Sequence, residues 1–310
     1  MNKQEELVSV IIPTYKRAMY LKRAINSVLA QSYKNIEIIV VDDNEPDSIY
    51  RKDNENMLKE FIEENKVIYI KHPKNMNGAA ARNTGIKKAK GKYITFLDDD
   101  DYFIDNRIEI IVDRLKNNAE YDGAYTGFKC VSNNKVVFKR NGEKSGNLKL
   151  NVLMQDSFFG TGSNMFFKAE IVKKIGFFDE KFTRHQDMEY MARFFDYGKI
   201  LAVKDILVIK YLDDKTNVQN FKKMLCTKEM FLEKFKNDIN SYNEKTQNII
   251  YFSNYLELLK CSDNKQEYKE ALNLIKKHKD VPIKYKKRLL RAKLSKNKLI
   301  YKIYKLLKEL

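Results

Sequence analysis

Short apolar runs alternate with helically spaced apolar positions over the first third of the chain. Four runs of aliphatic, β-branched and aromatic residues have the length of buried strands: 8–12, 36–41, 67–71 and 92–97. Between and after them, apolar residues recur every three or four positions, which predicts helices at about 18–31, 51–64, 79–89 and 106–116. Alternating strands and helices favour βαβ units with parallel strands. The pattern therefore predicts an α/β fold, a Rossmann-like and mostly parallel sheet flanked by helices.

The pattern changes after this alternation. Further strands are predicted at 123–128, 135–138 and 200–203, with helices at 168–175 and 186–197. Beyond Asp214 no strand pattern is found, and the chain predicts only helices, with breaks near Asn237, Ser262 and Pro282. We therefore expect two domains, an α/β domain over residues 1–212 and an all-helical region over residues 213–310.

Charge is high and unevenly distributed. The net charge is +17, and residues 281–310 supply +10 of it, with eleven Lys and Arg against the single acid Glu309. A basic tail predicts contact with an acidic surface, such as anionic lipid, nucleic acid or an anionic polymer.

Two further features predict the compartment. No apolar run approaches the roughly 18 residues of a transmembrane helix, and the amino terminus leads into a strand without a secretory signal pattern. The cysteines Cys130, Cys226 and Cys261 are far apart and lack metal-site spacing. A reduced, cytoplasmic protein is the simplest interpretation.

A run of four acids follows the fourth predicted strand. Asp98 to Asp101 come directly after Lys92 to Leu97, at the end of a strand expected to be buried. Adjacent carboxylates repel one another, and burial penalises their charge. A hard cation such as Mg²⁺ or Mn²⁺, shared with the oxygens of a substrate diphosphate, removes that cost. The alternative is a solvated acidic turn, and the run alone leaves both open.

Neighbouring strand ends carry other polar candidates. Asp43 can accept a hydrogen bond from a base or a ribose, although a turn cap is the simpler role for an Asp pair. Tyr15 can lie against a base, and Arg17 can pair with phosphate. Arg82, one turn into the third helix, can do the same or form a surface salt bridge. No Gly-x-Gly-x-x-Gly or Gly-Lys-Ser/Thr motif is present, so neither a dinucleotide site nor a P-loop is indicated.

Five motifs in this order and spacing resemble family-2 glycosyltransferases. They are Val8–Arg17, Ala24–Tyr33, Ile36–Asp43, Gly78–Gly85 and Tyr93–Tyr102. The resemblance covers about residues 7–205 and leaves the last hundred uncovered. It implies a GT-A fold and transfer of a sugar from a nucleotide donor, usually with inversion and a divalent metal.

The resemblance also assigns roles to residues. It implies that the nucleotide-sugar is lined by Pro13, Thr14, Tyr15, Asp43, Arg82, Asp98 and Asp99, to which the phosphate-pairing Arg17 is added. Asp98-x-Asp100 matches the family's DxD motif, so Asp100 and Asp98 are the expected ligands of Mn²⁺ or Mg²⁺. Here Asp101 makes the motif one acid longer.

A catalytic base is expected late in the domain. Inverting transfer needs a carboxylate that takes the proton of the acceptor hydroxyl. In the family this acid follows a Gly-x-Phe-Asp-Glu-like segment, and Asp187 follows Gly176–Glu180 in this way. A helix amino terminus at Asp187 would favour its ionised form, and a plain helix cap is the alternative. Gly162, His185 and Gln186 are candidate acceptor contacts, with His185 equally open to a structural role.

These observations predict a metal-dependent, inverting glycosyltransferase with a UDP-sugar donor. The expected acceptor is a bacterial surface glycan or a lipid-linked acceptor. Two other classes stay open, a sugar-phosphate or nucleotidyl transferase that uses the same acids, and a non-catalytic nucleic-acid-binding protein. The acid cluster and Asp187 argue against the last, so we expect no nucleic-acid partner.

The basic tail is the remaining expectation. At 100° per residue, its apolar side chains fall largely on one stripe: Leu289, Leu299, Ile300, Ile303 and Leu307. Such a helix can lie on the anionic inner face of the cell membrane, or its stripe can pack on the catalytic domain or on another subunit in a homo-oligomer.

Overall fold

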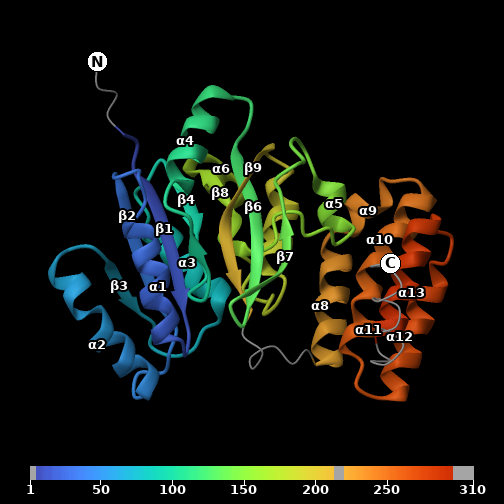
Figure 1. Ribbon diagram of the computed structural model, residues 1–310. Helices are drawn as coiled ribbons and strands as arrows, with labels where there is room; N and C mark the ends of the chain where they lie inside the picture. The colour runs from blue at the N-terminus through green and yellow to red at the C-terminus, as the bar shows by residue number, and fades with distance from the viewer. Residues whose placement is uncertain (1–4, 213–219, 296–310) are drawn as a thin grey trace. The chain divides into compact units, whose positions relative to one another are not determined.

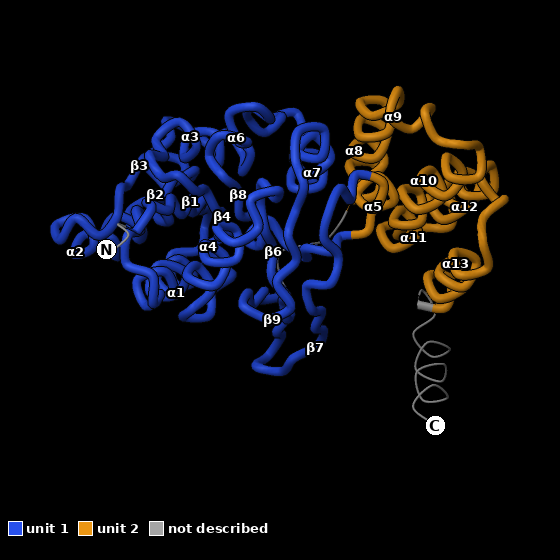
Figure 2. The backbone as a smooth tube through the Cα atoms, turned by 90° about the horizontal axis from the view of Figure 1, so that it is seen from above, with its two compact units in different colours: residues 1–149, 157–214 blue, residues 150–156, 215–310 orange. Residues whose placement is uncertain are grey.

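The computed structural model describes residues 5–212 and 220–295, and it divides the chain into two compact units. Unit 1 comprises residues Met1–Lys149 and Ser157–Asp214, and unit 2 comprises Leu150–Asp156 and Lys215–Leu310 (Figure 2). The division after Asp214 lies two residues beyond the predicted boundary, whereas the assignment of residues 150–156 to unit 2 has no counterpart in the sequence pattern.

The first half of unit 1 is the predicted βαβ alternation. Its strands are β1 (Val8–Thr14), β2 (Ile36–Asp42), β3 (Ile68–Lys71) and β4 (Tyr93–Phe96), and its helices are α1 (Ala18–Leu29), α2 (Ile49–Glu63) and α3 (Gly78–Lys88) (Figure 1). β1 pairs in parallel with both β2 and β4, and β2 pairs in parallel with β3. The carboxyl ends of these strands therefore meet at one edge of the sheet.

The second half of the sheet is mixed, which corrects the expectation of a mostly parallel sheet. Its strands are β5 (Tyr102–Phe103), β6 (Gly123–Ser132), β7 (Lys135–Arg140), β8 (Phe166–Lys168) and β9 (Ile200–Tyr211). The strand order is β3-β2-β1-β4-β8-β6-β9-β5, with β7 paired to β6. β8 runs antiparallel to β4 and β6, and β6 runs parallel to β9.

Helices cover both faces of the sheet. α1 and α4 (Arg107–Asn117) lie on one face, and α3 and α6 (Ala169–Ile175) lie on the other (Figure 2). The helix α7 (Gln186–Phe194) precedes β9. A short 3₁₀ turn, Gly162–Asn164, leads into β8.

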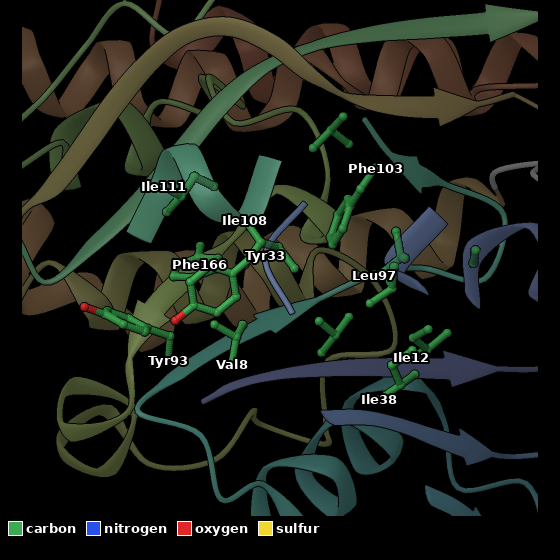
Figure 3. Close-up of a cluster of buried hydrophobic side chains, with 14 of the residues drawn as sticks. Val8, Ile12, Tyr33, Ile38, Tyr93, Leu97, Phe103, Ile108, Ile111 and Phe166 are labelled. Carbon is green, nitrogen blue, oxygen red and sulfur yellow. The ribbon is translucent and has the colours of Figure 1, made fainter. Parts of the chain in front are cut away.

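The core of unit 1 lies between the sheet and the helices α1 and α4. Its side chains come from strands and helices alike and include Val8, Ile12, Leu97, Phe103, Ile108, Ile111 and Phe166 (Figure 3). Most of these are completely buried. Burial of each such side chain contributes about 1.5–3 kcal/mol, so this layer fixes where the strand ends lie.

In its described residues unit 2 is all-helical, as expected of the carboxyl-terminal region. It contains α8 (Phe221–Lys234), α9 (Lys236–Asn240), α10 (Glu244–Leu256), α11 (Leu258–Cys261), α12 (Lys265–Lys277) and α13 (Ile283–Ser295), and it also takes up most of α5 (Lys149–Leu153). Lys228 is completely buried and links segment 150–156 to this unit. Its Nζ donates to Gln155 at 2.6 Å and pairs with Glu257 at 2.5 Å.

The described part of the basic tail is a helix, with its apolar side turned inward. Tyr285 and Ala292 of α13 are buried in the core of unit 2, and Leu289 packs against that core. Leu289 is the only residue of the predicted stripe that the described ranges include, since Leu299, Ile300, Ile303 and Leu307 fall in residues 296–310. Within the described residues, no helix is both long and apolar enough to cross a membrane.

Candidate active site

The four acids form a turn between β4 and β5, which we call the acid turn (residues 98–101). The strand β4 ends at Phe96, and the N–H of Asp101 donates to the carbonyl of Asp98 at 3.0 Å, which closes the turn. The turn places the four side chains in different surroundings. Asp99 and Asp101 are buried, and Asp98 and Asp100 are partly exposed.

Asp99 faces the end of β1. Its Oδ2 accepts hydrogen bonds from the Thr14 hydroxyl at 2.8 Å and from the Tyr15 N–H at 3.2 Å. Burial and the repulsion of Asp100 raise the pKa of Asp99 to about 7, although Arg17 opposes the rise. Asp99 therefore ties the acid turn to the segment 13–17, the predicted nucleotide segment.

Asp100 is held by two arginines of the β1–α1 region. Arg17 forms an ion pair with its carboxylate, and Arg23 donates to its main-chain carbonyl. The Arg23 guanidinium lies over three tyrosine rings, 4.7 Å from the centre of Tyr211, 4.9 Å from Tyr102 and 5.4 Å from Tyr20. Burial and the nearby Asp98 raise the pKa of Asp100, although Arg17 opposes this. The position of Asp100 therefore depends on the positively charged side chains of Arg17 and Arg23.

Asp101, the additional acid, points inward. It accepts hydrogen bonds from Ser163 at 2.6 Å, from Thr161 at 3.0 Å and from the Tyr211 N–H at 3.2 Å. Ser163 in turn accepts from the Asp98 N–H at 2.9 Å. Burial, with repulsion from Asp100 and Asp98, raises the pKa of Asp101 to about 8. Asp101 thus joins the acid turn to the segment 160–164 and to the end of β9.

Arg82 connects the acid turn with the start of α7. One guanidinium nitrogen pairs with Asp98, and the other donates to Gln186 Oε1 at 2.9 Å. Only 12% of the Arg82 side chain is exposed, so the surface salt bridge considered from the sequence is in fact a partly buried one. Gly162 lies next to both elements, because a Cβ there would be in ordinary van der Waals contact with Arg82 at 3.5 Å and with the Cβ of Asp187 at 3.9 Å.

Asp187 therefore lies beside the acid turn. It occupies the first turn of α7, and its Oδ1 accepts from the Met188 N–H at 2.9 Å. His185 precedes the helix in the left-handed conformation, with φ of 55°. The structure thus brings Gly162, Gln186 and Asp187 together with Arg82 and Asp98.

Asp43 has a different surrounding. Its carboxylate accepts hydrogen bonds from His72 at 2.8 Å, from Asn75 at 2.9 Å and from the N–H groups of Met76 at 2.7 Å and Asn77 at 2.9 Å. It therefore orders the loop before α3. By contrast, Tyr15 is 40% exposed at the same sheet edge, and the Nζ of Lys16 lies over its ring, 4.8 Å from the ring centre.

Lys210 is a site residue that the sequence interpretation missed. Its Nζ lies 3.5 Å from the carbonyl oxygen of Gly160. Burial alone would lower its pKa, but attraction to Asp101, Asp98 and Asp187 raises it. The predicted strand stopped at Val203, so Lys210 was left outside the site. The signal in the sequence that could have identified Lys210 is its position as a basic residue within the otherwise apolar run Ile206–Tyr211.

The acid turn fits a divalent cation only together with a substrate. Residues 5–212 and 220–295 contain no group of three His, Cys, Asp or Glu side chains placed to hold a metal. Asp98 and Asp100 offer carboxylate oxygens whose negative charge is otherwise offset by Arg82 and Arg17. Mg²⁺ is commonly held by one or two carboxylates with phosphate oxygens and water completing its shell. The residues present match that mode.

Known proteins resemble the chain in sequence. The family model for Glycosyl transferase family 2 matches residues 9–176. An uncharacterized glycosyltransferase of Rickettsia typhi is 29% identical over 218 residues, covering 69% of this chain and 66% of the relative. A glycosyltransferase of Rickettsia felis is 46% identical over 111 residues, 36% of this chain and only 17% of that relative. The chain therefore spans less than two thirds of these relatives.

Solved structures resemble it in fold. TarS 1–349 of S. aureus in complex with UDP-GlcNAc superposes with a TM-score of 0.59 at 13% identity, covering 89% of this chain and 90% of that one. A mannosyltransferase of Pyrobaculum calidifontis in complex with GDP-Man and Mn²⁺ gives 0.57 at 14% identity, covering 88% and 74%. These likenesses confirm the predicted GT-A fold. Since the family match spans more than half of its residues, the chain belongs to glycosyl transferase family 2.

Proposed function

We propose that this enzyme transfers a sugar from a UDP-sugar to a hydroxyl group, with inversion and with Mn²⁺ or Mg²⁺ at Asp98 and Asp100. The observation that carries the proposal is the Arg82 bridge, which pairs with Asp98 and donates to Gln186, the neighbour of Asp187. A carboxylate for proton removal and an anionic turn for a metal-bound diphosphate thus belong to one site.

In the proposed reaction Asp187 accepts the proton of the acceptor hydroxyl. The hydroxyl oxygen forms a bond to the anomeric carbon as the bond from that carbon to the diphosphate oxygen breaks, and its electron pair leaves with UDP. A bound divalent ion supplies positive charge that stabilises the leaving diphosphate. Arg17 can add positive charge near the diphosphate, and the amino terminus of α7 favours an ionised Asp187.

The other candidate residues are assigned to the donor or to the acceptor. We propose that Tyr15, Pro13, Thr14 and Asp43 lie along the nucleoside, with Asp99 and Asp98 near the ribose and metal. Gly162, His185 and Gln186 border Asp187 and are the proposed acceptor contacts. The TarS complex with UDP-GlcNAc has a related fold, which supports a uridine donor.

The roles of the two domains, the acceptor and the cellular location are also proposed. Residues 1–212 would carry the catalytic site, and residues 213–310 would contact the acceptor, a membrane or another subunit. We propose a bacterial surface glycan or a lipid-linked molecule as acceptor, and a cytoplasmic location at the inner face of the membrane.

A donor screen tests the function. The full chain is incubated with UDP-sugars and Mn²⁺, and slow donor hydrolysis is scored by the nucleotide released. UDP is expected, whereas UMP or pyrophosphate would indicate a sugar-phosphate or nucleotidyl transferase. The variant Asp100→Ala should stay folded and lose metal-dependent turnover. Unchanged turnover in that variant would remove the metal site from the proposal.

A further inference from the structure

The strands β6 and β7 form a projecting hairpin whose chemistry the catalytic proposal does not use. Asn133 and Asn134 connect the strands, with φ of 48° and 60°, the left-handed pair of a tight two-residue turn. β7 pairs with β6, and within the described residues its other edge has no strand partner. We call residues 128–140 the basic hairpin.

Three consecutive apolar side chains of the basic hairpin face solvent. Val136 is 54% exposed, Val137 57% and Phe138 51%. Phe138 contacts the buried Phe128, with 5.8 Å between the ring centres, so one side of its ring is anchored in the core of unit 1. Apolar side chains grouped in this way on a surface mark a site of interaction with a partner.

Within the segment that carries this apolar group, every charged residue is positive. Between Gly123 and Gly142 the chain has four basic residues and no acid: Lys129, Lys135, Lys139 and Arg140. Lys129 and Lys139 are direct cross-strand partners, an arrangement of like charges that destabilises a sheet. No ion pair with an acid is present for Lys129, Lys135 or Lys139 in the described part of the chain. Anionic groups placed between these side chains would relieve the repulsion.

The same charges disfavour a second copy of the chain as the partner. Antiparallel pairing of two β7 strands about a two-fold axis between Val137 and Phe138 would set Lys135 opposite Arg140 at both ends. Like charges directly opposite one another are destabilising, and edge lysines generally prevent such pairing. An anionic surface that also accepts apolar side chains fits better.

We propose that the basic hairpin docks on an anionic lipid surface, with Val136, Val137 and Phe138 in the headgroup boundary and the three lysine side chains of the hairpin on lipid phosphates. Apolar side chains combined with basic residues are the features that bind proteins to the interface of anionic membranes. This inference goes beyond the proposed function and does not depend on it, because vesicle binding requires neither donor nor turnover.

The absence of tryptophan from the chain allows a local test. A single probe is introduced as Phe138→Trp, and the full chain is titrated with vesicles of phosphatidylcholine containing phosphatidylglycerol as the anionic lipid. Its emission should shift to shorter wavelength and be quenched by lipids brominated in the acyl chain. Tyr197→Trp, at a position that is 55% exposed outside the hairpin, is the matched control and should not respond.

Affinity is then compared between variants. The double variant Val137→Ser/Phe138→Ser should bind the anionic vesicles at least about tenfold more weakly. Binding by Lys129→Gln/Lys139→Gln should be weaker at low salt and should depend less on salt than binding by the wild type. Equal binding by all variants, or no response from the tryptophan of the Phe138→Trp variant in bound protein, would overturn the proposal. Polyuridine is tested as a competitor of the vesicles. If polyuridine bound through the lysines and independently of Val137 and Phe138, the hairpin would be a nucleic-acid surface and the proposal would be overturned.

Discussion

At the scale of the residue, the proposed function gives Asp187 and Asp100 separable tasks. Asp187 is the proposed proton acceptor, whereas Asp100 is a proposed metal ligand whose carboxylate pairs with Arg17 and whose main-chain carbonyl accepts from Arg23. A proton acceptor affects the chemical step, and a ligand carboxylate affects what binds. Substitutions at the two positions should therefore change different measured quantities.

Asp187→Asn should reduce the rate of transfer by about 10²–10⁴-fold, the range of general base catalysis, because only the proton acceptor is removed. Donor affinity should be retained. Initial rates and UDP-sugar binding by calorimetry measure the two effects. Asp205→Asn, a change at an exposed acid of β9, is the control. If donor affinity fell as far as the rate, Asp187 would be a binding or structural residue.

The three tyrosine rings around Arg23 predict a second effect. In Tyr211→Leu the guanidinium loses a ring contact worth about 0.5–2 kcal/mol, so the Asp100 carbonyl should be held less firmly. Mn²⁺ affinity in the presence of UDP, measured by electron paramagnetic resonance, should fall about two- to tenfold. Tyr211→Phe keeps the ring and should bind Mn²⁺ like the wild type. A similar loss in both variants would contradict a role for the ring.

The sequence predicts which residues gather at the candidate site better than it predicts the groups that surround each of them. The acid turn, Arg82 and Asp187 were named from motifs. The inward direction of Asp101 depends on Thr161, Ser163 and Tyr211, which lie 60, 62 and 110 positions away. Local pattern carries no information on such partners. From the sequence, Asp43 was expected to accept a hydrogen bond from a nucleotide base or a ribose. Its hydrogen bonds to the loop 72–77 could not be foreseen, because they depend on how the chain connects β3 to α3.

At the scale of the element, β9 shows why one strand was predicted too short. The predicted strand ended at Val203, before the charged pair Lys204 and Asp205. In the structure this pair is exposed at an irregularity of the β6–β9 pairing, where Val203 lies opposite Thr126 and Ile206 opposite Gly127. The strand continues beyond it to Tyr211. A bulge can remove two charged residues from the ladder, and an alternation pattern cannot anticipate this.

The packing of α10 against His278 predicts a pH effect on unit 2. His278 stacks on Tyr251 with 4.6 Å between ring centres and contacts Asn248 at 3.0 Å. Burial, with the charge of Lys277, lowers the pKa of His278. The unfolded chain then binds the proton more readily, so this contribution to stability is present above about pH 6.5 and is lost as pH falls.

Thermal unfolding followed by circular dichroism in the far ultraviolet checks this effect. Between neutral and mildly acidic pH the loss of Tm should be smaller in His278→Phe than in the wild type, because Phe keeps the stacked ring and does not titrate. The carboxylates titrate in both proteins, so the difference isolates His278. Identical losses would show that His278 does not contribute to the pH dependence.

At the scale of the whole molecule, the excess of positive charge is divided among separate parts of the chain. Residues 281–310 supply +10 of the net +17, and the basic hairpin carries four further basic side chains. The inward side of α13 is already used, because Tyr285 and Ala292 are buried in unit 2. Membrane binding by the tail therefore has to come from the side chains that α13 exposes, which include Ile283 and Leu290 beside the basic residues, and from residues 296–310.

This changes the deletion that tests the tail. Removal of residues 282–310 would expose the core of unit 2, at roughly 1.5–3 kcal/mol for a large apolar side chain such as Tyr285. A chain that ends at Ser295 keeps α13 and loses five basic residues and four apolar residues of the predicted stripe. Each basic residue near an anionic surface is worth about 1 kcal/mol and is screened by salt. The shortened chain should therefore sediment less with anionic vesicles at low salt, and the difference should shrink at high salt.

The measurement is repeated in the Val137→Ser/Phe138→Ser background, where the two losses should add if hairpin and tail bind separately. Equal sedimentation of the shortened and the full chain in both backgrounds would show that the tail does not contribute to membrane binding.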